Sequence, residues 1–348
     1  MRIAEFDYEL PDELIAQHPV VPRDASRLLV LERVGGAIAH RRFRDLPEYL
    51  RDGDLLVLND TRVIPARLLG YKAGTGGSAE VLLLKTTGSD SWEALVRPGR
   101  RLQPGAHILF GNDELEAEVL DVTPGGGRIV RLRPGANAGE RTMHDLLHAL
   151  GELPLPPYIT HGPLPAARGV YQTIYALHEG SSAAPTAGLH FTEEIFAALE
   201  ARGVRRAFVT LHIGMGTFKP VQVEDVEEHE IHEEYFSVSE ETAALINETR
   251  ARGGRIVAVG TTSTRTLESA ADAQGVVHAK IGPTRLYIVP GYRFKVVDVQ
   301  VTNFHLPRST LLLLISAFAG RENVLRAYRE AVRERYRFLS FGDAMLII

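Results

Sequence analysis

The hydrophobic pattern between about residues 68 and 133 has a period of two, and the flanking segments do not share it. Acidic residues at every second position from Glu114 to Glu118 alternate with apolar residues, and Arg131 and Arg133 do the same. This alternation is typical of half-buried antiparallel strands. The glycine-rich turns between the strands are expected at residues 74–77, 88–90, 104–105, 111–113 and 125–127. Short strands with frequent turns predict a small antiparallel β-barrel.

After Pro157 the pattern changes to strands alternating with helices. A helix is expected over residues 192–203, a strand over 206–213, a second helix over 239–253, and a buried strand over 256–259 that leads into a third helix. Serine and threonine at the helix starts and glycine at the ends fit the usual capping preferences. The alternation predicts a layered α/β domain with a largely parallel sheet.

Two strand-like runs near the N-terminus, at residues 28–31 and 55–58, fit the same α/β domain. In that case the barrel interrupts the α/β domain as an insertion. We therefore expect residues 1–65 and 152–348 to form the α/β domain and residues 66–151 to form the inserted barrel.

Composition narrows the class of protein further. A chain of 348 residues is long enough for about two domains. It contains no cysteine, which excludes disulfides, thiolate metal sites and cysteine nucleophiles. The longest strongly apolar run, residues 311–319, is about half of a bilayer span, and no signal-like segment opens the chain. We expect a soluble cytoplasmic protein. The net charge of −5 does not favour RNA binding, but the arginines are clustered.

Two glycine-rich loops each carry a histidine where a predicted strand ends. His190 lies in the segment APTAGLHFT, and His212 lies in LHIGMGTF about twenty residues later. Glycine allows a ligand to approach the backbone closely, and histidine has the unperturbed pKa nearest neutrality. A histidine at a strand end is often only structural, but two such loops favour a single active site.

A third loop, residues 260–265, follows a buried strand and opens a helix. It offers free backbone amides, hydroxyl groups and the guanidinium of Arg265, and helix N-termini of this kind bind carboxylate or phosphate. A simple serine/threonine cap is the alternative. The segment lacks G-x-G-x-x-G, which argues against a dinucleotide site.

The chain resembles the S-adenosylmethionine:tRNA ribosyltransferase-isomerases of queuosine biosynthesis in motifs spread over nearly its whole length. Besides the two histidine loops, the matching segments are residues 59–67, 151–158, 171–175, 259–265, 302–307 and 336–345. It departs from the family pattern at residues 168–170, 181–182 and 280–285. The resemblance implies the same two-part fold, an α/β domain interrupted by a β-barrel.

The resemblance also implies an activity. The ribosyl group of S-adenosylmethionine would be transferred to 7-aminomethyl-7-deazaguanine at the wobble position of a tRNA with a GUN anticodon. Epoxyqueuosine would form, and adenine and methionine would be released. S-adenosylmethionine would then be a co-substrate, with no recycled cofactor, no membrane partner and a monomeric enzyme.

The site residues expected from this resemblance have three roles. His190 and His212 would act as general base and general acid, in either order, because a sulfonium acidifies the adjoining 5′ carbon and departing adenine needs a proton. The methionine carboxylate would lie near Arg265, and the amides around Gly214 would hold the ribose or the modified base. The substrate-binding set is Thr186, Gly188, Gly214, Gly216, Thr217, Thr262, Ser263, Arg265 and Asn303. Phe191, Phe218 or Tyr171 would stack on the splayed-out base.

His305 is a third catalytic candidate. It lies between a strand expected over residues 294–301 and a very apolar helix that begins near Ser309. It would either close the pocket or form hydrogen bonds with the polar groups of a buried strand end.

A row of arginines is expected in the last helix beside an apolar stripe, namely Arg326, Arg329, Arg333 and Arg337. With an RNA substrate these side chains would contact phosphates, whereas the alternative is a solvated face with ion pairs. The predicted tRNA-binding residues are Arg62, Arg67, Arg326, Arg329, Arg333 and Arg337.

His229 and His232 lie among several glutamates and, on one helical turn, would resemble a metal site. Dense carboxylates are more often a solvated acidic surface, and a third defined ligand is missing. We expect no metal, although the family pattern includes His229, His232 and Glu234.

Two other functions stay open from the sequence alone. A methyltransferase would use the same co-substrate, but the glycine-rich turn of its usual form is missing. A noncatalytic RNA-binding module would explain the barrel and the arginines but not the two histidine loops.

Overall fold

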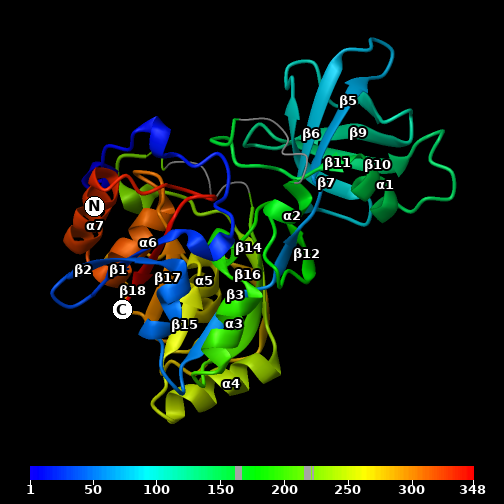
Figure 1. Cartoon of the computed structure of the whole chain (residues 1–348). Coiled ribbons are helices and arrows are strands. Elements are labelled where there is room, and N and C mark those ends of the chain that lie inside the picture. Colours follow the sequence, from blue (N-terminus) through cyan, green and yellow to red (C-terminus); the bar gives the residue numbers. More distant parts are fainter. Residues whose placement is uncertain (161–166, 215–220, 222) are drawn as a thin grey trace.

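The structure, a computed structural model, describes residues 1–160, 167–214, 221 and 223–348. A large mixed sheet with helices on both faces forms one part, and a β-barrel projects from it (Figure 1). The predicted class, a layered α/β domain interrupted by an antiparallel barrel, is confirmed. The predicted domain boundaries at residues 65 and 152 stay a prediction.

The large sheet has nine strands with a parallel centre. In sheet order they are β16 (Lys280–Thr284), β14 (Glu234–Val238), β13 (Arg205–His212), β3 (Leu55–Asn59), β15 (Ile256–Val259), β17 (Val299–Asn303), β18 (Ala344–Ile347), β1 (Arg27–Leu31) and β2 (Ile38–Arg42). β13, β3, β15 and β17 are mutually parallel, as are β18 and β1, and the remaining neighbours are antiparallel. The central strands are buried throughout, as expected for parallel strands covered on both faces.

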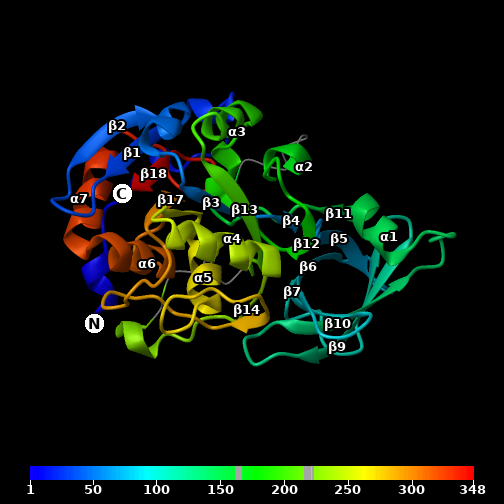
Figure 2. The ribbon, with the colours of Figure 1, turned by 90° about the horizontal axis from the view of Figure 1, so that it is seen from below.

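Successive residues of each central strand face opposite layers. Leu55 and Val57 belong to the larger hydrophobic core, with α4 (Glu240–Ala251), α5 (Thr261–Ala270), α6 (Thr310–Ala319) and α7 (Arg321–Arg333). Leu56 and Leu58 belong to a second core, with α3 (Glu193–Glu200) and the 3-10 helix η4 (Phe43–Tyr49). Figure 2 shows α3 on one side of the sheet and α4, α5 and α6 on the other.

Side-chain caps fix the starts of three predicted helices. Thr192 accepts a hydrogen bond from the backbone N–H of Ile195 at the start of α3, and Ser239 and Ser309 cap α4 and α6 in the same way. A cap of this kind contributes about 1 kcal/mol to helix stability. The predicted helix positions are confirmed to within a few residues.

The barrel closes through six antiparallel strands. In order they are β5 (Arg67–Lys72), β6 (Ser78–Thr86), β7 (Ser91–Arg97), β10 (Arg128–Pro134), β9 (Leu115–Val122) and β8 (His107–Phe110), which pairs back with β5. Leu115, Ala117 and Val119 are buried while their acidic neighbours are not, so the predicted period of two is confirmed. The helix α1 (Met143–Leu150) packs on this core, and β11 (Gly151–Glu152) pairs with β5.

A small parallel pair of strands lies between the two parts, with β4 (Thr61–Val63) beside β12 (His178–Ser181). The remaining short elements are η1 (Ile3–Phe6), η2 (Asp12–Leu14), η3 (Arg23–Ala25), α2 (Ala167–Val170), η5 (Thr186–His190) and η7 (Val226–Glu228). Within the described segments, no helix has the length and apolarity needed to cross a membrane.

Three local predictions are wrong. Residues 294–298 are not strand, because the backbone N–H groups of Lys295, Val296 and Val297 donate to the carboxylate of Glu268 instead of a ladder. Arg337 lies beyond α7, which ends at Arg333. The third error is the single helical turn expected for His229 and His232, since residues 229–233 connect η7 to β14 without helix.

Candidate active site

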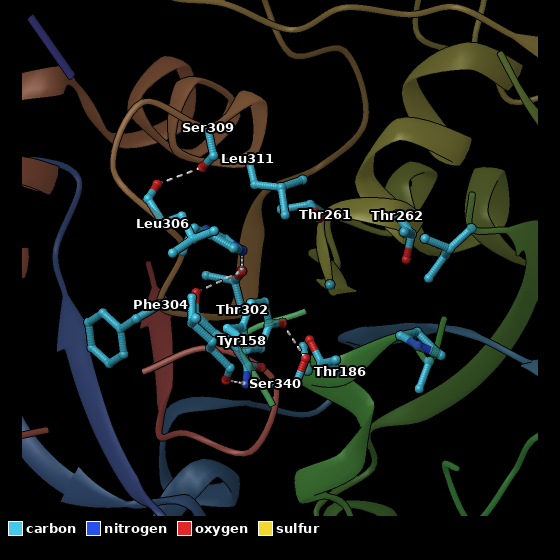
Figure 3. Close-up of a pocket in the computed structure, with 18 residues that line it drawn as sticks. Tyr158, Thr186, Thr261, Thr262, Thr302, Phe304, Leu306, Ser309, Leu311 and Ser340 are labelled. Atoms are coloured by element: carbon cyan, nitrogen blue, oxygen red, sulfur yellow. Dashed lines mark hydrogen bonds between the residues drawn. The ribbon is translucent and has the colours of Figure 1, made fainter. Parts of the chain in front are cut away.

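A pocket lies beyond the carboxyl ends of the parallel strands, where ligands bind in open α/β sheets (Figure 3). Its volume is about 690 Å³, counting space open to solvent. Ile213 follows β13, Gly260 follows β15, and Thr302 and Asn303 end β17. The parallel arrangement therefore brings the ends of separate strands to one cavity.

Thr186 also lines this pocket, so the two histidine loops do meet there, through Thr186 and Ile213. Thr262 and Asn303 join them from the predicted set. Gly216 and Thr217, and Phe218 from the predicted stacking platform, lie outside the described residues.

The Asn59 side chain ties the strand ends together. Its amide nitrogen donates to the carbonyl of Leu211 and to the hydroxyl of Thr262, at 3.0 and 3.2 Å. Its oxygen accepts from the N–H groups of Thr61 and Leu211. Sequence reasoning gave Asn59 no role, although an asparagine that ends an apolar strand was visible. Asn59 holds Thr262 at the pocket wall.

The start of α5 supplies part of the wall. Gly260 has φ +86°, a conformation that favours glycine, and Thr261 and Thr262 follow it into the pocket lining. The Ser263 hydroxyl instead donates to the carbonyl of Val259 at 2.7 Å, and Ser263 is fully buried. The Ser263 hydroxyl is therefore bound to the end of β15, and Ser263 does not line the pocket.

Among the described residues, His305 is the histidine that lines this pocket. Its Nδ1 lies 3.3 Å from the hydroxyl of Tyr328, and its Nε2 lies 3.3 Å from the hydroxyl of Thr302. Burial lowers the pKa of His305 to about 3. The imidazole is therefore neutral at pH 7 and has the protonation state of a general base.

His190 lies in the layer behind the pocket. Its Nδ1 is 2.8 Å from the hydroxyl of Ser26, and its ring stacks on Phe43. Burial lowers the pKa of His190 to about 4, and the nearby Asn303 side chain opposes this shift. In the described structure neither His190 Nε2 nor Asn303 Oδ1 has a hydrogen-bond partner. The two side chains nevertheless lie close enough for Asn303 to raise the pKa of His190 against the effect of burial.

His212 faces a different environment. Its Nδ1 is 2.8 Å from the hydroxyl of Thr61, and its ring packs so closely on Gly180 that a Cβ there would lie within 3.0 Å of it. Burial lowers the pKa of His212, and His178 adds to the effect. The structure does not bring the rings of His190 and His212 into the same pocket.

A second pocket, of about 460 Å³, adjoins the first and shares Leu311 with it. Arg265 and Glu234 form an ion pair in its wall, and the Nε of Arg265 donates to the carbonyl of Leu286. Arg265 Nη2 and the Tyr287 hydroxyl are buried without a hydrogen-bond partner among the described residues. His229 and His232 complete the polar lining. This pocket therefore offers paired charges and two unused donors.

The two remaining glycines of the predicted set have different surroundings. The N–H of Gly214 lies 3.4 Å from Glu234 Oε1, at the edge of the second pocket. A Cβ on Gly188 would lie 1.9 Å from the Tyr175 hydroxyl, so close packing against Tyr175 requires glycine there.

The expected stacking platform is wrong for two of its three members. Tyr171 and Phe191 are fully buried, Tyr171 against Phe341 and Phe191 between Phe43 and Phe196. Neither ring presents a face to a base.

The predicted tRNA-binding arginines do not form one group. Arg326, Arg329 and Arg333 are exposed along α7, where Arg333 pairs with Glu330. Arg337 donates to the carbonyl of His18, and the exposed Arg62 to that of Ala176. Arg67 lies between Glu80 and Glu152. The row on α7 is the part most open to a ligand.

The fold and the two joined pockets define an α/β protein with an inserted barrel and a small-molecule site at the ends of its parallel strands. The family model described as queuosine biosynthesis protein matches residues 3–347. A relative from Moorella thermoacetica, named S-adenosylmethionine:tRNA ribosyltransferase-isomerase, is 60% identical over 100% of both chains. A relative of the same name from Symbiobacterium thermophilum is 58% identical, also over 100% of both.

A crystal structure of S-adenosylmethionine tRNA ribosyltransferase from Thermotoga maritima is similar as well, with 43% identity and a TM-score of 0.56. The match covers 99% of this chain and 100% of that one. The chain therefore belongs to the queuosine biosynthesis protein family. It is an enzyme of the class to which these ribosyltransferase-isomerases belong.

Proposed function

We propose that this enzyme transfers and isomerises the ribosyl group of S-adenosylmethionine onto 7-aminomethyl-7-deazaguanine at the tRNA wobble position. Epoxyqueuosine forms, and adenine and methionine leave. Family membership supports the reaction class, since relatives identical at 53–60% carry that name. The observation that carries the proposal is the pair of joined pockets, one lined by neutral His305 and one by the Arg265–Glu234 ion pair.

S-adenosylmethionine suits the two pockets because its two ends differ chemically. The methionine end carries an ammonium and a carboxylate, and the second pocket has a carboxylate at Glu234 and unused donors at Arg265 Nη2 and Tyr287. The adenosine end suits the larger pocket. Leu311, common to both, then lies beside the sulfonium.

His305 is the general base in this proposal. The sulfonium acidifies the 5′ carbon, and a neutral imidazole in the pocket lining can accept the proton. The Tyr328 hydroxyl orients the ring through Nδ1, and Nε2 accepts the proton once the substrate displaces its 3.3 Å contact with the Thr302 hydroxyl. A base in the pocket needs no rearrangement of the strand ends.

His190 and His212 have different parts. The His190 imidazole and the Asn303 side chain lie close together, and both suit hydrogen bonds to the departing adenine. His212 braces the β13 end through Thr61 and acts on the site through Ile213 and Gly214. A buried polar atom without a partner costs about 1–3 kcal/mol, and a ligand that pairs with it removes that cost.

The tRNA, with a GUN anticodon, is proposed to contact exposed arginines. Arg326, Arg329 and Arg333 provide a row of cations along α7, and Arg62 a further one near the barrel. Arginines that neutralise phosphate charge increase the affinity for tRNA, but they do not distinguish one RNA sequence from another.

The reaction is tested by mass spectrometry of enzyme, S-adenosylmethionine and tRNA that carries the aminomethyl base. Adenine, methionine and a ribosyl-derived adduct on the tRNA are expected in equal amounts, and tRNA with unmodified guanine is the control. S-adenosylhomocysteine with a methylated nucleoside would show a methyltransferase instead. Unchanged S-adenosylmethionine beside tRNA binding would show a binding module.

The placement of the methionine end is tested by Arg265→Ala, with Arg285→Ala as a matched control. Both arginines pair with a glutamate, but Arg285 is exposed and lines neither pocket. Loss of a charge-assisted contact worth about 1.5–3 kcal/mol raises the KM for S-adenosylmethionine about 10–100-fold. An unchanged KM in Arg265→Ala at wild-type folding would contradict this placement.

A further inference from the structure

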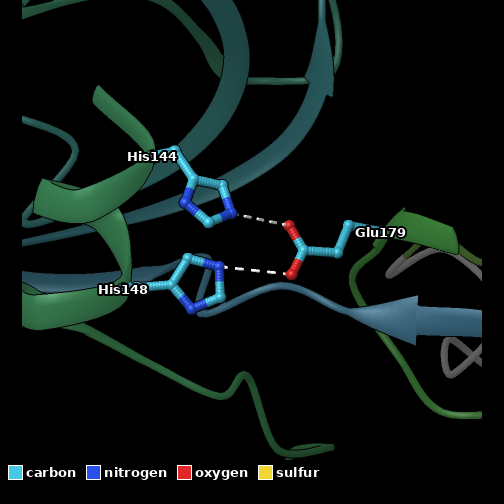
Figure 4. A group of neighbouring side chains, drawn as sticks. All are labelled: His144, His148 and Glu179. Atoms are coloured by element: carbon cyan, nitrogen blue, oxygen red, sulfur yellow. Dashed lines mark hydrogen bonds and ion pairs between the residues drawn. The ribbon is translucent and has the colours of Figure 1, made fainter. Parts of the chain in front are cut away.

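A group of two histidines and one glutamate lies away from both pockets, at the joint between the barrel and the α/β part (Figure 4). His144 and His148 are one helical turn apart on α1, and their rings lie side by side with centroids 4.2 Å apart. Glu179 faces them from β12. His144 Nε2 is 3.2 Å from one carboxylate oxygen of Glu179, and His148 Nε2 is 3.3 Å from the other.

The donor atoms are those of a zinc site. Zinc binds imidazole nitrogen and carboxylate oxygen at about 2.0–2.2 Å, usually with tetrahedral geometry. Tetrahedral ligands at that radius are separated by about 3.3–3.5 Å. The two N···O distances are close to that value, and one donor atom from each of the three residues lies within 4.8 Å of the others. The two histidines contact different oxygens of Glu179, so a single cation would bind after the imidazole nitrogens and the carboxylate move toward it.

The helix supports this arrangement. Histidines at positions i and i+4 face the same direction, as in helical zinc motifs. Thr142 and Asp145 form a capping box that fixes the first turn of α1, and Leu146 anchors the helix in the barrel core. The Asp145 carboxylate accepts from the N–H and the hydroxyl of Thr142 and lies next to His144 in the chain. A carboxylate beside the cluster adds negative charge favourable to a cation.

We propose that His144, His148 and Glu179 bind one zinc ion, with water in the remaining position, and that this ion links the barrel helix α1 to strand β12. The group is the one set of three or more possible ligands found in the described part of the chain. It is unrelated to the proposed reaction, because none of the three residues lines either pocket.

Zinc would add a contact between the barrel helix α1 and strand β12. Lys85 of the barrel pairs with Glu233 at 3.2 Å, but Lys85 is exposed, and exposed pairs contribute little. A metal bound only by the folded arrangement stabilises that arrangement by mass action. The orientation of the barrel is therefore expected to become more rigid when zinc is present.

The site is tested by calorimetric titration of the full-length, chelator-treated protein with zinc chloride, and with magnesium chloride as the hard-cation control. One zinc per chain with micromolar or tighter affinity is expected, and no magnesium binding, because imidazole selects zinc over magnesium. Loss of a residue that merely supports a metal ligand costs about 10–100-fold in affinity. His144→Ala, His148→Ala and Glu179→Gln should each weaken binding at least that much.

His107→Ala is the matched control, because His107 is an exposed barrel histidine paired with a single carboxylate, Glu116. It should bind zinc as the wild type does. X-ray absorption should show two imidazole ligands, and zinc should raise the melting temperature of the wild type but not of His148→Ala. The proposal is overturned by the absence of stoichiometric binding. It is equally overturned by binding that survives all three substitutions and disappears in a His229→Ala, His232→Ala double variant.

Discussion

The barrel and the α/β part bury polar side chains in opposite ways. Arg128 is the one buried polar or charged side chain in the described barrel strands, and its guanidinium donates to the carbonyls of Leu102, Gly99, Gly126 and Gly127. In the α/β part, Asn59, Asn303, His190 and His305 are buried together at the ends of parallel strands.

The difference lies in whether these groups are satisfied. Each of the three nitrogens of Arg128 has a carbonyl partner, and four of its five N–H donors are used, so Arg128 holds the barrel loops together. Arg265 Nη2 has no hydrogen-bond partner among the described atoms, and neither has the Tyr287 hydroxyl in the same pocket. An unpaired buried polar group lowers the stability of the fold. A ligand that supplies the missing hydrogen-bond partner explains why such a group is present. The barrel is built for stability and the strand ends for binding.

The largest expected effect comes from His305→Gln, which keeps a polar group in the pocket but removes the base. Loss of a general base typically costs about 10²–10⁴-fold in rate. Single-turnover ribosyl transfer should fall by that amount while tRNA binding and the circular dichroism spectrum are unchanged. A rate within a few-fold of wild type would remove His305 from the chemistry.

Phe110→Ala tests whether the barrel contributes to stability and not to the chemistry. Phe110 is fully buried in the barrel core, and truncation of such a ring costs about 3–5 kcal/mol in the free energy of unfolding. We expect that loss in urea denaturation, with the turnover of folded protein at low temperature changed only a few-fold. A loss of turnover as large as that in His305→Gln, at equal folded fraction, would mean that the barrel takes part in the chemistry.

The pH dependence of stability should come from the buried histidines of the α/β part. Burial lowers the pKa of His190 to about 4 in the folded state, from about 6.5 when unfolded. Between these values the unfolded chain binds more protons, so the free energy of unfolding falls as the pH falls from 6.5 to 4. Between pH 7 and pH 5, His190 alone lowers the free energy of unfolding by an amount on the order of 2 kcal/mol.

The measurement is urea denaturation of the wild type and of His190→Gln at both pH values and the same ionic strength. The variant should be less stable at pH 7 but should lose less on acidification. Parallel losses in the two proteins would show that His190 does not carry this dependence.

The smallest effect is expected for Arg333→Ala. Arg333 is exposed and pairs only with nearby glutamates of its own helix end, so stability should change by less than about 0.5 kcal/mol. If Arg333 contacts a phosphate, tRNA affinity should fall a few-fold, and the slope of log affinity against log salt should become shallower by about 1. An unchanged salt slope would limit the RNA surface to the other arginines.

Much of the fold could be predicted because its patterns are local. The two-residue period of β9 and the serine and threonine caps of α3, α4 and α6 each depend on a few neighbouring residues. The strand predicted over residues 294–301 was wrong for residues 294–298, because a distant carboxylate, Glu268, takes N–H groups of that segment. No residue within that segment indicates that Glu268 would accept hydrogen bonds from its backbone.

The candidate site was predicted only in part. Thr186, Thr262, Asn303 and His305 do line one pocket, and the motifs at strand ends indicated them. The separation of His190 from His212 could not be predicted, because their similar sequence surroundings give no information on which way each ring points. The pairing of Arg265 with Glu234 could not be predicted either, because the two residues are 31 positions apart in the sequence.

The sequence by itself determined the two kinds of architecture, the starts of the main helices and the family. Periodicity, helix caps and motifs each depend on residues that are close together in the chain. The tertiary structure decided which polar groups are neutral, paired or unpaired. Those properties depend on burial and on partners from distant segments, as in the contact of Asn303 with Leu339 and of His144 with Glu179. Chain order does not fix such contacts until the strands and helices are packed.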